Sequence, residues 1–155
     1  LPKQFRKIGL LLVGISILMI VTDYFGALTF LEDISVFAVY NSGVPFDQSE
    51  GAHHFFQVIR DDFRFEMIVV LALVGLLFFG FAKRKNEDEL VQKIRLNSLL
   101  WATYVHFIVF ILFTIFTFGF FYLNFLLIGV FTILVIYILR FEYKVFQLYK
   151  TLNEK

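Results

Sequence analysis

The fold is decided by residues 99–139, LLWATYVHFIVFILFTIFTFGFFYLNFLLIGVFTILVIYIL, which contain no Asp, Glu, Lys or Arg. A helix that crosses a bilayer needs about 20 consecutive apolar residues, so this stretch is long enough for two. Gly119 to Asn124 holds the residues for a tight turn. The stretch therefore predicts two membrane spans, at about 99–121 and 123–139.

Two further apolar blocks lie outside this stretch, at about 8–24 and 67–82. The whole chain is 59% hydrophobic with a mean hydropathy of +0.79. Soluble domains are about 45–50% apolar, so a soluble class is excluded. We expect an all-α membrane protein, in which residues 1–155 form a single domain with four transmembrane helices.

The basic residues alternate with the apolar blocks. Twelve of the 14 Lys and Arg residues follow or precede the spans in three segments: Lys3, Arg6, Lys7; Lys83, Arg84, Lys85, Lys93, Arg95; and Arg140, Lys144, Lys150, Lys155. Lys and Arg near the ends of spans stay on the cytoplasmic side. The distribution predicts a multi-pass protein with both termini in the cytoplasm. The topology also explains these short basic clusters, so nucleic acid is not an expected partner.

Helices three and four are predicted to form a long antiparallel hairpin. Apolar and large residues recur four, three and four residues apart beside both spans: Leu90, Ile94, Asn97 and Trp101 before the third, and Phe141, Val145, Leu148 and Leu152 after the fourth. This spacing is typical of two helices that pack along one seam. We expect a cytoplasmic stem that extends about two to three turns beyond the bilayer.

Residues 25–66 form the one sizeable region outside the predicted spans, on the outer face. Residues 30–40 fit either a strand or a helix on the membrane surface, because short apolar runs do not separate the two. A Ser cap at Ser49 and the apolar positions Phe55, Ile59 and Phe63 predict an amphipathic helix near 49–65.

Small residues also recur within the spans. Gly9, Ser16 and Asp23 are seven residues apart in the first, and Ala72 and Gly75 lie in the second. Small residues let helices approach closely in lipid, so these positions predict helix packing.

His106 is the one ionisable residue well inside a predicted span. Thr103, Thr114 and Thr117 fall on the same helical face. Ionisable groups inside a membrane usually face other helices, so we expect His106 to point toward the protein and to accept or donate a hydrogen bond within about 3.2 Å. A proton or polar-ligand site and a haem site are the alternatives, although no other span offers a second His as axial ligand.

Two other groups carry ionisable side chains of interest. Asp23 near the outer end of the first span is expected to be an interfacial carboxylate, solvated or paired with Arg60 or Arg64; a cation site is the alternative. On the outer face, the cluster of His53, His54, Glu50 and Asp61 has metal-ligand chemistry. Adjacent His residues diverge on a helix and no known motif is present, so a structural interpretation is favoured over a metal site.

The chain shows none of the common catalytic signatures. It has no Cys, which excludes thiolate chemistry and Cys-ligated metals. Neither a nucleophile elbow nor a Walker loop nor a dinucleotide fingerprint is present. We therefore expect a protein without enzymatic activity, with no catalytic residues, no cofactor and no bound metal.

Two segments resemble a family of small, uncharacterised four-span inner-membrane proteins of Bacteroidota. These segments are Pro2-Lys3-Gln4-Phe5-Arg6-Lys7-Ile8-Gly9 and Asp88-Glu89-Leu90 with Ile94-Arg95-Leu96 and Leu100-Trp101-Ala102-Thr103-Tyr104-Val105. The resemblance covers about a third of the chain and implies a bacterial inner-membrane location. No known activity of the family can be carried over.

We expect a non-enzymatic accessory or scaffold protein that acts in a homo-oligomer or a larger membrane complex, with the bilayer and a protein as its partners. The alternative is a small transport or sensing module, which would use the His106 and Thr face or the outer His pair.

Overall fold

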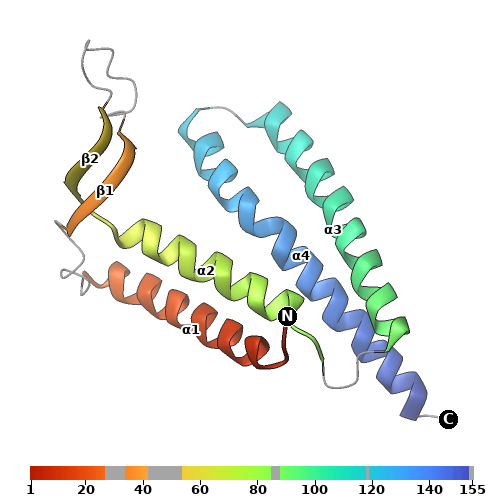
Figure 1. The fold of residues 1–155 in the computed structure, drawn as a ribbon. Coiled ribbons are helices and arrows are strands. Elements are labelled where there is room, and N and C mark those ends of the chain that lie inside the picture. The colour runs from red at the N-terminus through yellow and green to blue at the C-terminus, as the bar shows by residue number, and fades with distance from the viewer. Residues whose placement is uncertain (27–33, 42–53, 85–87, 118, 154–155) are drawn as a thin grey trace. The chain divides into compact units, whose positions relative to one another are not determined.

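The structure is a computed structural model that describes residues 1–26, 34–41, 54–84, 88–117 and 119–153 (Figure 1). These residues form four helices and one two-stranded sheet, in the order α1 (Gln4–Tyr24), β1 (Ile34–Asn41), β2 (His54–Asp61), α2 (Arg64–Phe81), α3 (Glu89–Phe116) and α4 (Phe120–Asn153). The chain divides into two compact units, which are described separately: residues 1–13 with 73–155, and residues 14–72.

All four helices are long and apolar enough to cross a membrane, with mean hydropathies of 2.0 to 2.2 over their most apolar windows. Most of each predicted span falls on a different one of these helices. Many large apolar side chains on these helices are exposed, among them Leu10, Leu18, Ile108 and Ile128. Outward-facing apolar side chains are what a lipid environment requires, so the four-helix prediction is confirmed and fits a multi-pass membrane protein.

The connection between α3 and α4 lies earlier than the sequence predicted. Helix α3 ends at Phe116 because the next residue, Thr117, is extended (φ −122°, ψ 130°). Gly119 then adopts φ +77°, a left-handed conformation that glycine reaches without steric cost. Helix α4 starts at Phe120, so the third span is shorter than 99–121 and the fourth begins before residue 123.

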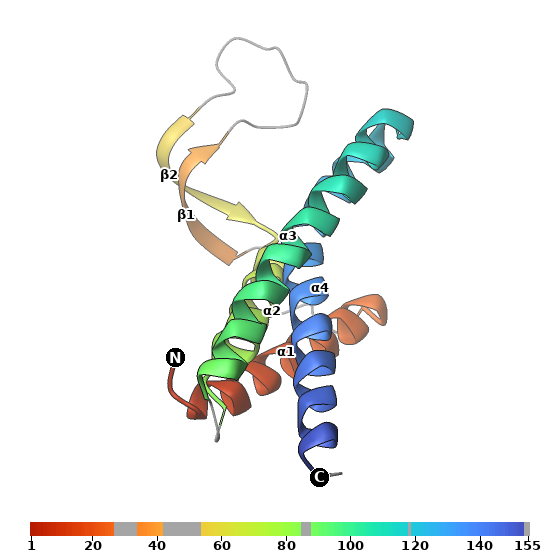
Figure 2. The same cartoon turned by 90° about the vertical axis from the view of Figure 1, so that its right-hand side faces the viewer.

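In the first unit, α3 and α4 pack along each other (Figures 1 and 2). Their shared core consists of Val91, Ala102, Tyr137, Ile138, Phe141 and Val145. On α4, Phe141 and Val145 are both buried. The α3 side of the predicted seam is shifted by one residue, because Val91 is buried at 2% exposure and Leu90 is 54% exposed.

Small side chains explain this shift. Ser98 and Ala102 are almost fully buried, whereas Trp101 remains half exposed. A seam through Ser98 and Ala102 lets the two helix backbones approach more closely than one through Trp101 would. The indole of Trp101 lies instead under the guanidinium of Arg140, 4.0 Å from the ring centroid.

The start of α1 packs against the second half of α2 in the same unit. A Cβ atom on Gly9 would lie 2.7 Å from the carbonyl oxygen of Gly75 and closer still to the backbone nitrogen of Phe79. A Cβ on Gly75 would lie 2.8 Å from Val13 Cγ2. Glycine is required at both positions for this approach, as the pattern of small residues predicted.

The second unit holds an antiparallel hairpin of β1 and β2, with Ile34 opposite Asp61 and Phe37 opposite Val58. The prediction of an amphipathic helix near 49–65 is wrong for residues 54–61, which form β2; residues 49–53 lie outside the described residues. Aromatic and β-branched residues are common in this segment and favour a strand when a partner is available, which 34–41 supplies. For 34–41 the strand alternative holds.

Candidate functional sites

One end of the first unit carries an arginine–glutamate cluster, formed by Arg6, Arg84 and Glu142. Glu142 lies on α4, Arg6 in the first turn of α1, and Arg84 just after α2. Arg6 Nη2 donates to Glu142 Oε1 at 3.1 Å, and Arg84 Nη2 donates to Oε2 of the same carboxylate. One carboxylate therefore holds together three segments that are far apart in the sequence.

Aromatic rings support the guanidinium groups at this end. The guanidinium carbons of Arg84 and Arg95 lie 5.4 and 5.1 Å from the centroid of the Phe141 ring. Arg6 lies 5.1 Å from the ring of Phe79. These distances are within the range of cation–π attraction, about 6 Å.

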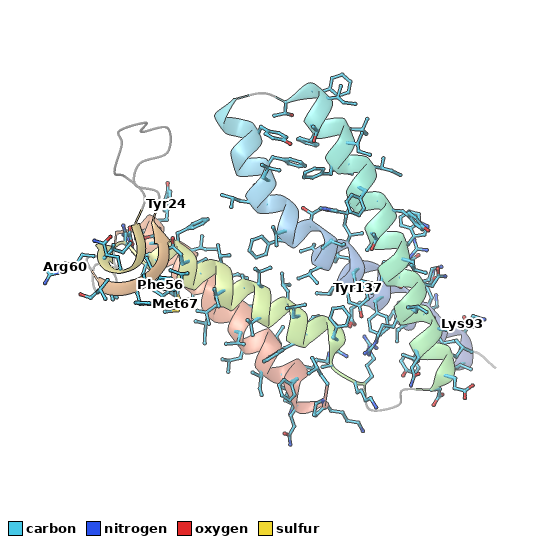
Figure 3. The ribbon with its side chains drawn as sticks, turned by 45° about the horizontal axis from the view of Figure 1, so that its top comes forward. Tyr24, Phe56, Arg60, Met67, Lys93 and Tyr137 are labelled. Carbon is cyan, nitrogen blue, oxygen red and sulfur yellow. The ribbon has the colours of Figure 1, made fainter. Side chains whose placement is uncertain are left out.

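The last carbonyls of α2 receive side-chain donors from α3 and α4. Arg95 donates to the carbonyl oxygens of Phe81 and Ala82, both at 3.2 Å. Tyr137, which is fully buried between the helices of this unit (Figure 3), donates its hydroxyl to Gly80 O at 2.8 Å. The final carbonyls of a helix lack partners within the helix and carry partial negative charge, so these donors stabilise the end of α2.

A pocket of about 750 Å³ opens beside this helix end. Its lining residues come from the end of α2, from Lys83 and from one face of α3: Phe81, Lys83, Glu89, Gln92, Lys93, Arg95, Leu96 and Leu99. The polar members of this α3 face lie in the first turns of the helix, where Figure 3 shows Lys93, and the apolar members follow toward its middle. The pocket is therefore basic at one end and apolar at the other.

In the second unit, Arg64 joins two carboxylates. Its Nη1 lies 3.1 Å from Asp23 Oδ1, and its Nε and Nη2 lie 2.8 and 2.6 Å from the two oxygens of Asp62. Asp23 is thus paired with Arg64, one of its two predicted partners. The other, Arg60, points away from the hairpin (Figure 3).

The contact with Arg64 also changes the acidity of Asp62. Hydrogen bonds from the Arg64 side chain, and next from its backbone N–H at 3.1 Å, lower the pKa of Asp62 from 3.8 to about 2. Both bonds favour the charged form of the carboxyl group. Arg64 is the first residue of α2, so its backbone hydrogen bond to the Asp62 carboxylate also satisfies a donor at the start of this helix.

His106 faces α4, as predicted. A Cβ on Gly129 would lie 3.9 Å from His106 Cε1, and the imidazole ring lies 5.9 Å from the ring of Phe110. The expected hydrogen bond is not found within the part of the chain that the structure describes. The contacts of His106 that the structure describes are with the rings of Phe107 and Phe110.

The threonines near His106 do not converge on it. Thr103 and Thr114 donate their hydroxyls to carbonyl oxygens one turn earlier, Leu99 O at 2.9 Å and Phe110 O at 2.8 Å. Thr117 ends α3, where its backbone N–H bonds to Phe113 O at 2.8 Å. Thr103 and Thr114 therefore donate their hydroxyl hydrogens within α3.

Two residues of the predicted cluster, His54 and Asp61, lie on a strand and not on the helix that the prediction assumed. His54 and Asp61 lie at opposite ends of β2, and seven residues of extended strand span about 23 Å. His53 and Glu50 lie outside the described residues. Among the residues described, no group of three or more His, Cys, Asp or Glu side chains is arranged to hold a metal ion.

Sequence reasoning missed Glu142 and Arg95 as structural centres. A signal for Glu142 was present: it is the sole acidic residue in the basic segment from Arg140 to Lys150. An acid that interrupts a basic segment at the end of a span is a candidate for pairing with arginines of other helices. No comparable signal marked Arg95.

Comparison of the chain with protein-family models, with curated proteins and with solved structures gives no match.

Proposed function

We propose that this chain is a non-enzymatic integral membrane protein of a bacterial inner membrane, which acts as an accessory or scaffold subunit in a homo-oligomer or a larger complex. Its N- and C-termini would be cytoplasmic, as the three basic segments next to the spans suggest. The resemblance of its N-terminal and α3 segments to inner-membrane proteins of Bacteroidota supports the location.

The proposal includes a cytoplasmic stem on a long antiparallel hairpin of α3 and α4. Helix α4 has 34 residues, which corresponds to about 51 Å, whereas the hydrocarbon core is about 30 Å thick. Its first part, 120–139, contains no charged residue, and its remainder begins with Arg140 and Glu142. The charged remainder is therefore the part that would extend beyond the bilayer. The closeness of His106 to Gly129 and the shared core of Val91, Phe141 and Val145 support the pairing of the two helices.

The observation that carries the proposal is a pair of exposed aromatic side chains on this stem. Tyr143 and Phe146 are 59% and 68% exposed. Because they are three residues apart, they lie on one face of α4. Exposed aromatic groups outside the hydrocarbon region are typical of protein contact surfaces. We therefore propose that the Tyr143 and Phe146 face binds a partner chain or a second copy.

The test is gentle-detergent extraction of the tagged full chain, followed by measurement of its mass and identification of stoichiometric partners. The Phe146→Asp variant should lose the partner or the second copy, since a charge replaces the aromatic contact. The control Thr151→Asp adds the same charge at an exposed position on another face of α4. This variant should retain the partner or the second copy. A monomeric wild-type chain without a stoichiometric partner would refute the proposal, as would equal retention by both variants.

A further inference from the structure

We infer that the pocket beside the end of α2 binds the headgroup of an anionic phospholipid, with the first part of an acyl chain along its apolar wall. The inference goes beyond the scaffold role and does not depend on it. The headgroup would lie against Lys83, Gln92 and Lys93, and the chain against Phe81, Leu96 and Leu99.

The order of residues along α3 matches the order of chemical groups in a phospholipid. Glu89, Gln92, Lys93, Leu96 and Leu99 follow one another three or one residues apart and share a helical face. From Lys93 to Leu99 the helix rises about 9 Å, so the wall changes from cationic to apolar within the depth of one headgroup and glycerol backbone. A soluble phosphate compound has no acyl chain that would contact the apolar half of the pocket.

The net charge of the pocket suits an anion. Lys83, Lys93 and Arg95 contribute three positive charges, and Glu89 contributes one negative charge. Arg95 is oriented by the carbonyl oxygens of Phe81 and Ala82, which keeps its guanidinium at the pocket wall. Lys ammonium groups are compact cations that bind phosphate oxygens well, and Gln92 adds a neutral donor.

The position of the pocket along α3 agrees with the depth of lipid headgroups. The uncharged part of α3 runs from Leu96 to Phe116, about 30 Å, which matches the hydrocarbon thickness. Arg95 therefore marks the boundary of the hydrocarbon region, and the lysines lie just outside it. Basic pockets at this depth beside membrane helices are known to recognise anionic headgroups.

Native mass spectrometry of the purified full chain in detergent, titrated with phosphatidylglycerol or phosphatidylcholine, tests the inference. The Lys83→Gln/Lys93→Gln variant should bind phosphatidylglycerol about 25-fold more weakly, since each lysine near an anionic surface contributes about fivefold. The control Lys7→Gln/Lys144→Gln removes the same charge outside the pocket and should bind as the wild type does. Equal binding by the two double variants, or equal affinity for the two lipids, would overturn the inference.

Two further measurements distinguish a lipid headgroup from a soluble phosphate and test the role of Glu89. Inorganic phosphate at millimolar concentration should not displace phosphatidylglycerol; full displacement would assign the pocket to a soluble anion and refute the lipid. Glu89→Gln should tighten binding of phosphatidylglycerol about fivefold, because it removes the negative charge that the described lining residues place in the pocket. Binding is measured on the extracted chain, so loss of a protein partner would not affect the result.

Discussion

Arg6 and Glu142 are 136 positions apart in the sequence, yet Arg6 Nη2 lies 3.1 Å from Glu142 Oε1. The same carboxylate also accepts a hydrogen bond from Arg84. About two thirds of the Arg6 and Glu142 side chains and more of Arg84 are shielded from solvent. Shielding strengthens a charged hydrogen bond relative to a surface pair, so this contact ties the first helix to the last.

Replacing Glu142 by Gln should lower the free energy of unfolding by about 1–2 kcal/mol, because it leaves Arg6 and Arg84 without a charged acceptor. Thermal unfolding in detergent micelles measures the change. Glu66→Gln, at an exposed acid in the first turn of α2, is the control and should change stability by less than about 0.5 kcal/mol. Equal effects of the two variants would show that the arginine–glutamate cluster does not stabilise the folded chain.

Gly9→Ala should destabilise the chain by about 1–3 kcal/mol, because its methyl group would collide with backbone atoms of Gly75 and Phe79. Gly14 on the same helix is the matched control. Apart from its chain neighbours and the nearby backbone of α1, no heavy atom of the described residues lies within 4 Å of a Cβ placed there, so Gly14→Ala should be neutral or slightly stabilising. The prediction is wrong if both variants unfold at the wild-type temperature.

The carboxyl group of Asp62, which is paired with Arg64, should titrate in acid. The pKa of Asp62 is lowered to about 2 in the folded chain, so its contribution to stability is present at neutral pH and is lost as the pH falls from about 4 through about 2. NMR titration of the Arg64 amide in micelles should show this midpoint. Arg64→Gln should raise the midpoint toward 3.8, and a wild-type midpoint already near that value would contradict the assignment.

His106 should tolerate an apolar replacement. Its described neighbours are the rings of Phe107 and Phe110, so His106→Leu should cost less than about 1 kcal/mol and His106→Asn should cost more, since an amide without partners is poorly accommodated there. Thermal unfolding of both variants tests the order. A haem Soret band in the wild type that His106→Leu abolishes would instead establish the cofactor alternative.

The proposed orientation predicts opposite labelling of two single-cysteine variants, which are clean reporters because the chain has no Cys. In intact cells, a membrane-impermeant maleimide should label Ser42→Cys on the outer face and should not label Asn86→Cys. After permeabilisation both should react. Labelling of Asn86→Cys in intact cells would reverse the orientation.

The region between α1 and α2 shows where the prediction from sequence failed. Residues 54–61 can place apolar groups on one helical face or alternate them along a strand, and the local pattern permits both. The strand forms because residues 34–41 supply its hydrogen-bond partner, a contact that no local window contains. The candidate His and Asp cluster depended on the helix, so the separation of His54 and Asp61 followed from the same error.

The sequence by itself determined the existence and approximate position of the four apolar helices, because the cost of exposing backbone or charge to lipid acts on each segment separately. It also indicated that small residues such as Gly9 and Gly75 would lie at contacts. Only the tertiary structure decided that Val91 rather than Leu90 is buried, that Arg64 rather than Arg60 pairs with Asp23, and that Glu142 joins two arginines. In the first two cases the alternatives are residues of similar chemistry that lie close together in the sequence, so the local pattern does not separate them. In all three cases, contacts with residues distant in the sequence decide which residue is buried or paired.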